Sequence, residues 1–95
     1  MAASSGSDPE AELDRLVRRL RTLSPRAWAA AGRRDVVRRL VAELAALSAP
    51  GRPVPALRDY ALGDAVAVIG WDALGSPQTR ERAAQLVRDA LEATR

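Results

Sequence analysis

The stretch "DYALGDAVAVIGWDAL", residues 59 to 74, is the most apolar part of this 95-residue chain. Its longest uninterrupted run of apolar residues or glycine spans residues 65 to 71, with Asp64 and Asp72 at its two ends. A helix that crosses a bilayer needs about 20 such residues, so this stretch is too short for a membrane span. It predicts instead a helix that packs against protein.

On a helical wheel, this stretch carries large apolar side chains on two nearly opposite sides. One side holds Leu62, Ala65, Val66, Ile69 and Ala73. The other side holds Leu57, Tyr60, Ala61, Val68 and Trp71. The strip between them consists of Gly63, Ala67 and Gly70, whose small size lets another backbone approach closely. A helix of this kind requires neighbours on more than one side.

Two interpretations of this two-sided helix follow. The one that we favour is a central helix that packs on several others all round. In the alternative, another chain covers the face of Tyr60, Val68 and Trp71, because Tyr and Trp often anchor protein interfaces. Asp64 lies in the middle of this face, and we expect an arginine or Tyr60 to pair with it rather than a catalytic role. Asp59 and Asp72 lie outside this face, and both are expected to be in solvent.

Four further helices are predicted on either side of this stretch. Their apolar residues recur at helical spacing, and Ser-Pro or Asp-Pro pairs stand where helices begin. With the stretch itself, the expected helices span about 9–23, 25–31, 34–47, 56–74 and 77–94. No alternating strand pattern occurs, so the predicted fold is an all-α bundle of four main helices and one short helix.

The chain length and the proline positions predict one domain. Residues 1–8 are expected to form a flexible tail, and residues 9–95 a single helical domain with a proline-rich connection at 48–56. The amino terminus lacks the basic and apolar regions of a signal peptide, which favours a cytoplasmic protein. Arginine is the only basic residue type, a bias typical of a GC-rich genome.

The absence of cysteine and histidine excludes several kinds of chemistry. Disulfides, Cys/His metal sites, thiol catalysis and histidine acid/base catalysis are impossible without these residues. No lysine or histidine is available to activate a serine or threonine. We therefore expect no enzyme activity, no cofactor and no bound metal.

The charge is unevenly distributed along the chain. The segment from Arg15 to Arg39 contains nine arginines and one acid, a net charge of +8, whereas the rest of the chain carries −5. The two parts can attract each other within the fold or between copies. Alternatively, a basic face binds nucleic acid or phosphate, and the residues expected on it are Arg15, Arg18, Arg19, Arg34 and Arg38.

The composition and the central stretch together favour a small protein that binds another protein or a second copy of itself. The residues expected at the contact are Tyr60, Asp64, Val68 and Trp71, with Trp28 as a possible second anchor. Binding of nucleic acid through the basic segment is the alternative.

Overall fold

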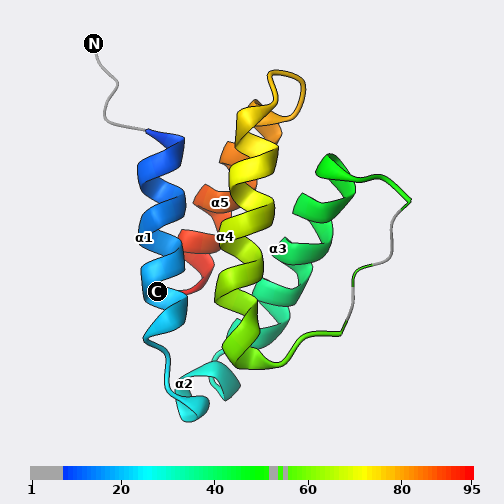
Figure 1. Ribbon diagram of the computed structural model, residues 1–95. Helices are drawn as coiled ribbons and strands as arrows, with labels where there is room; N and C mark the ends of the chain where they lie inside the picture. Colours follow the sequence, from blue (N-terminus) through cyan, green and yellow to red (C-terminus); the bar gives the residue numbers. More distant parts are fainter. Residues whose placement is uncertain (1–7, 52–53, 55) are drawn as a thin grey trace.

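The computed structural model describes residues 8–51, 54 and 56–95, which form a bundle of helices (Figure 1). The described residues contain no strand, which confirms the predicted all-α fold. The helices are α1 (Pro9–Arg21), α2 (Pro25–Ala29), α3 (Arg33–Ser48), α4 (Asp59–Gly75) and α5 (Arg80–Ala93). None of these helices has the length and apolar character that a bilayer crossing needs.

The first two helices begin where the sequence predicts. Asp8 caps α1, and its side chain accepts a hydrogen bond from the backbone nitrogen of Glu10. Ser24 caps α2 in the same way, through the backbone nitrogen of Ala27. Each helix has proline in its first turn, where a missing backbone N–H costs nothing. Of the predicted tail at 1–8, residues 1–7 lie outside the described residues.

Two helices begin about three residues later than predicted. Arg58 is still extended, so α4 starts at Asp59 rather than at residue 56. Residues 77 to 79 form a turn, and α5 starts at Arg80. Thr79 stabilises this turn, because its hydroxyl donates a 2.6 Å hydrogen bond to the carbonyl oxygen of Ala73 in the last turns of α4. Of the proline-rich connection, residues 52, 53 and 55 lie outside the described part of the chain.

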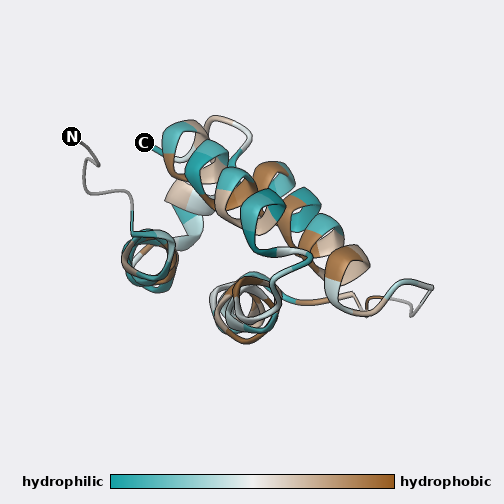
Figure 2. Cartoon of the chain, turned by 90° about the horizontal axis from the view of Figure 1, so that it is seen from above, coloured by the Kyte–Doolittle hydropathy of each residue, from teal (hydrophilic) through white to brown (hydrophobic). Residues whose placement is uncertain are grey.

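The four longer helices form two layers. Seen from above, α1 and α4 run nearly end-on in one layer, and α3 and α5 cross behind them in the other (Figure 2). Helix α4 contacts α1, α3 and α5, while α2 lies beside α3 at one end of the bundle. The molecule is thin, with extents of 40 × 32 × 16 Å.

The core lies between these layers and consists mainly of leucine, valine and alanine. Its largest fully buried apolar side chains are Leu13, Leu16, Leu20, Val37, Val41, Leu44, Leu62, Val66, Leu74 and Val87. The strip of small residues on α4 faces α1. A Cβ atom added at Gly70 would lie 2.8 Å from a methyl group of Leu13, and one added at Gly63 would lie 3.3 Å from Cγ of Arg21. The expected close approach of another helix is therefore confirmed.

Helix α4 is central, but neighbours do not surround it. Its side away from α3 and α5 faces outward, because the described residues form no third layer (Figure 2). The favoured interpretation, in which other helices of the same chain cover α4 all round, is therefore wrong for one side. The physical reason is that three neighbours on a 16 Å-thick molecule leave one face of this helix open.

Candidate functional site

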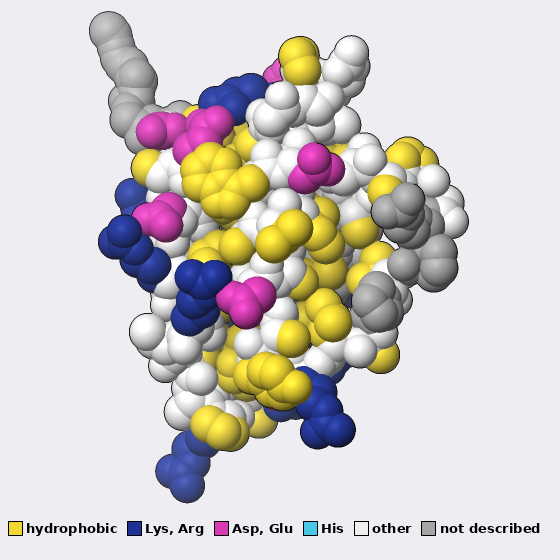
Figure 3. Space-filling model, viewed as in Figure 1, with side chains coloured by type: hydrophobic (Ala, Val, Ile, Leu, Met, Phe, Trp, Pro, Cys, Tyr) yellow, Lys and Arg dark blue, Asp and Glu magenta, His cyan; other side chains and the backbone are white. Residues whose placement is uncertain are grey.

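The open side of α4 carries the residues that the sequence singled out. Tyr60 is 81% exposed, Val68 is 71% exposed and Trp71 is 48% exposed. Asp64 lies among them and is also exposed. We call these four residues the α4 outer face. In the view of Figure 3 it points toward the reader, and hydrophobic side chains extend along α4 with a few charged ones between them.

Helical geometry explains why these four residues share one face. At 100° per residue, Tyr60 and Trp71 point within about 20° of each other, and Asp64 and Val68 follow within about 80°. Ala67 lies on the same side and is half-buried. The face therefore has a small residue near its centre and an aromatic residue toward each end. The strip of small residues that packs on α1 lies next to it.

Asp64 forms an ion pair with α1. Nη2 of Arg21 donates a 2.7 Å hydrogen bond to Oδ1 of Asp64, and Nε donates another of 3.1 Å to the same oxygen. The stem of Arg21 passes over Gly63, where the missing side chain leaves room for it. The expected pairing of this carboxylate with an arginine is confirmed. Both side chains are more than half exposed, so the pair contributes little to stability.

Asp59 is not in solvent as the sequence suggested. Nε of Arg34 donates a hydrogen bond of 2.8 Å to one of its oxygens, and Nη2 donates one of 2.6 Å to the other. Arg38 lies 3.9 Å away. The hydrogen bonds from Arg34 lower the pKa of the Asp59 carboxyl below its usual range, against a smaller opposing effect of burial. Asp59 begins α4, so this pair fastens the amino end of α4 to α3. Asp72, in contrast, is exposed as expected.

Trp28 does not belong to the exposed surface. It is only 4% exposed and forms part of the core, so the expectation that it serves as a second anchor is wrong for this chain. A single tryptophan in a five-residue helix has too little sequence context to tell a core residue from a surface one. The fold decides, because α2 packs against α3 with this side chain inward.

The arginines proposed for nucleic-acid binding have different surroundings. Arg18 pairs with Asp14 at 2.9 Å, and Arg34 and Arg38 face Asp59. Arg19 points toward the end of α5, where Nη1 donates hydrogen bonds of 2.7 Å to the carbonyl oxygen of Leu91 and 3.2 Å to the hydroxyl of Thr94. Arg15 is exposed and has no ion-pair partner among the described residues.

An open groove lies at the amino end of α4, beside the outer face. It has a volume of about 810 Å³, and its charged lining residues are Arg21, Arg34, Arg38, Arg58, Asp59 and Asp64. Arg21 and Arg58 are not among the site residues that the sequence predicts. They lie far apart in sequence, on either side of α3, so no local pattern indicates that they line the same groove. Arg58 has no ion-pair partner in the described part of the chain, whereas the other three arginines face carboxylates.

The described residues hold no group of three acidic side chains close enough to bind a metal ion. The chain matches no protein-family model, and neither the curated proteins nor the solved structures contain a significantly similar chain.

Proposed function

We propose that this chain is a small, non-enzymatic interaction protein of the cytoplasm, and that it binds its protein partner through the α4 outer face. The observation that carries the proposal is the distribution of exposed apolar groups. Of the four large hydrophobic side chains that are exposed among the described residues, three lie on this one face, and Val54 is the other.

The chemistry of the face suits a protein partner. Covering a large apolar side chain contributes roughly 1.5–3 kcal/mol, so three of them on one face supply several kcal/mol toward association. Tyrosine and tryptophan are common anchors of protein interfaces because they combine a large apolar area with a polar group. The exposed Asp64 and Arg21 pair adds a charged contact within the same area.

A photo-crosslinking experiment tests this function. A diazirine-bearing amino acid replaces Val68 in the full chain, and irradiation takes place in the cells that produce it. We expect one dominant protein adduct, whose mass shows whether the partner is a second copy or another protein. Replacing Tyr60 and Trp71 with alanine in the same chain should remove this adduct.

The matched control places the same amino acid at Glu92, which is exposed on α5 in the other layer. This position should give no dominant adduct. Equal adducts from both positions, or none from position 68, would contradict the proposal.

Nucleic-acid binding is the alternative proposal, and the groove at the amino end of α4 favours it most. Four arginines line this groove, but it also contains two carboxylates, which form ion pairs with three of the four arginines. Binding to mixed-sequence DNA and RNA across a salt series tests it, because phosphate contacts make affinity fall steeply with salt. Lack of binding at low salt would rule it out.

A further inference from the structure

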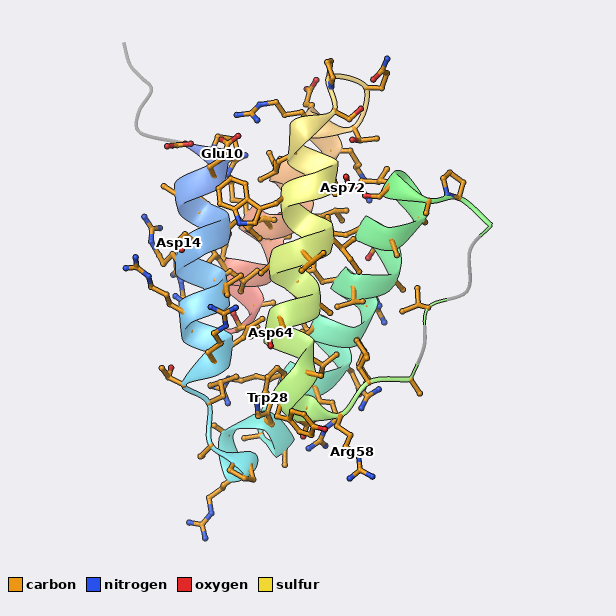
Figure 4. The ribbon with its side chains drawn as sticks, in the orientation of Figure 1. Glu10, Asp14, Trp28, Arg58, Asp64 and Asp72 are labelled. Carbon is orange, nitrogen blue, oxygen red and sulfur yellow. The ribbon has the colours of Figure 1, made fainter. Side chains whose placement is uncertain are left out.

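Opposite charges flank the α4 outer face at its two ends. Arg58 immediately precedes α4, and Asp72 follows Trp71 near its other end. Both are exposed, and neither has an ion-pair partner within the described ranges. Figure 4 shows both on the side of α4 toward α3, at opposite ends of the helix.

The two aromatic residues of this face are arranged about the same centre as the two charged residues. The midpoint between Tyr60 and Trp71 in sequence falls between Ala65 and Val66, and the midpoint between Arg58 and Asp72 falls at Ala65. A twofold axis placed there, perpendicular to α4, exchanges the two aromatic residues. It also exchanges the basic end with the acidic end. The contact between two identical copies must be self-complementary in this way.

From this symmetry we infer that the partner on the α4 outer face is a second copy of the chain, with the two α4 helices antiparallel. Tyr60 of each copy then packs against the partner's Trp71. Residues on the same side of two antiparallel helices stay together, so Arg58 of each copy reaches the partner's Asp72. This inference rests on the proposed function, because it requires that the face binds protein at all.

The centre of the face permits close packing. Ala67 is small and half-buried, and the axes of packed helices lie 8–10 Å apart, depending on the side chains at the contact. Tyr60 and Trp71 are separated by about 16 Å along the helix, so the two aromatic contacts lie on either side of this centre. Asp64 keeps its own Arg21 and needs no partner from the second copy.

A dimer with the two α4 helices parallel is less favourable, because of the same terminal charges. In a symmetric parallel pair the two Arg58 residues would lie at the same height on opposite edges of the contact, as would the two Asp72 residues, so no Arg58 would meet an Asp72. Only the antiparallel arrangement brings opposite charges together at both ends.

Charge reversal combined with analytical ultracentrifugation tests this inference. At low salt the wild-type chain should shift with concentration from 10.2 kDa to twice that mass. Arg58→Glu and Asp72→Arg should each weaken self-association about tenfold, because each places like charges together at both ends. The double variant should restore it. An equimolar mixture of the two single variants should form a mixed dimer, since both of its charge pairs are complementary.

The control variants make the same charge changes elsewhere. Arg39→Glu on α3 and Glu92→Arg on α5 alter exposed residues that have no ion-pair partner among those described. They should leave self-association unchanged, and circular dichroism should show every variant folded. A wild-type chain that stays at 10.2 kDa up to ~1 mM would overturn the second-copy inference. The crosslink from position 68 would then still decide whether the face binds another protein. A double variant as weak as the single ones would overturn the antiparallel register.

Discussion

Individual residues in this fold differ sharply in how well they tolerate substitution. The two glycines toward the carboxyl end of α4 illustrate this. Gly70 faces α1, where both methyl groups of Leu13 lie within 3.0 Å of the position of an added Cβ. Leu13 is fully buried and has little room to move. Gly75, in the same helix, has open space around its Cβ position. The same substitution therefore has opposite effects at these two positions.

Gly70→Ala is expected to destabilise the fold by about 1 kcal/mol. Overpacking a core costs about 1–3 kcal/mol, and this exceeds the helix-propensity gain of up to ~1 kcal/mol. The melting temperature should fall by about 4–8 °C. Gly75→Ala serves as the control and should stabilise the protein by about 0.4–1 kcal/mol. Thermal unfolding followed by circular dichroism measures both, and a rise in melting temperature for Gly70→Ala would contradict the close packing of α1 on α4.

At the scale of the helices, several ends are held by side chains from other parts of the chain. Arg19 on α1 binds the carboxyl end of α5, and Arg34 on α3 binds the amino end of α4. Unpaired carbonyl groups at a helix end attract a positive charge, which explains the position of Arg19. An arginine that looks like a free basic residue in the sequence can thus have a structural role.

Replacing Arg19 with glutamine should lower stability by about 1–2 kcal/mol, because the carbonyl of Leu91 and the hydroxyl of Thr94 lose a charged donor. Arg15→Gln is the matched control on the same helix, since Arg15 is exposed and unpaired within the described ranges. Urea unfolding measures both. Equal losses for the two variants would show that net charge, rather than the contact with α5, decides the effect.

The helices themselves were predictable because their signals are local. Capping residues and proline in the first turn mark α1 and α2, and the spacing or density of apolar residues marks α3, α4 and α5. The start of α4 was missed because alanine and leucine before Arg58 suit a helix equally well. The partners of Asp59 and the burial of Trp28 were not predictable, since both depend on helices far apart in sequence. The face of Tyr60 and Trp71 was found from its pattern, but only the packing shows it open.

For the whole molecule, charge pairing joins the two halves of the chain. Arginines of the first half reach Asp59 and Asp64, while Arg80 and Arg88 of the last helix reach Glu10 and Glu12 on α1. The hydrogen bonds from Arg80 lower the pKa of Glu10 to about 2 from an ordinary value of 4.5. A carboxyl whose pKa is lower in the folded state stabilises the fold only where it is ionised.

Stability should therefore depend on pH through Glu10. The contribution of the Arg80 pair is fully present above pH 4.5 and is lost as the pH falls toward about 2. Glu10→Gln should be less stable than the wild type at pH 7, and the difference should disappear by about pH 2. Urea unfolding at a series of pH values measures it, with the exposed Glu92→Gln as control. A difference that stays constant down to pH 2 would contradict this assignment.

The two-layer construction also has an evolutionary consequence. The residues that hold the fold together lie between the layers, and the α4 outer face lies outside them, so the two sets hardly overlap. Substitutions on the outer face are therefore expected to change binding while they leave the packing of the core in place. Binding specificity can then change during evolution without a change of the bundle, and this face can be redesigned while the core stays as it is.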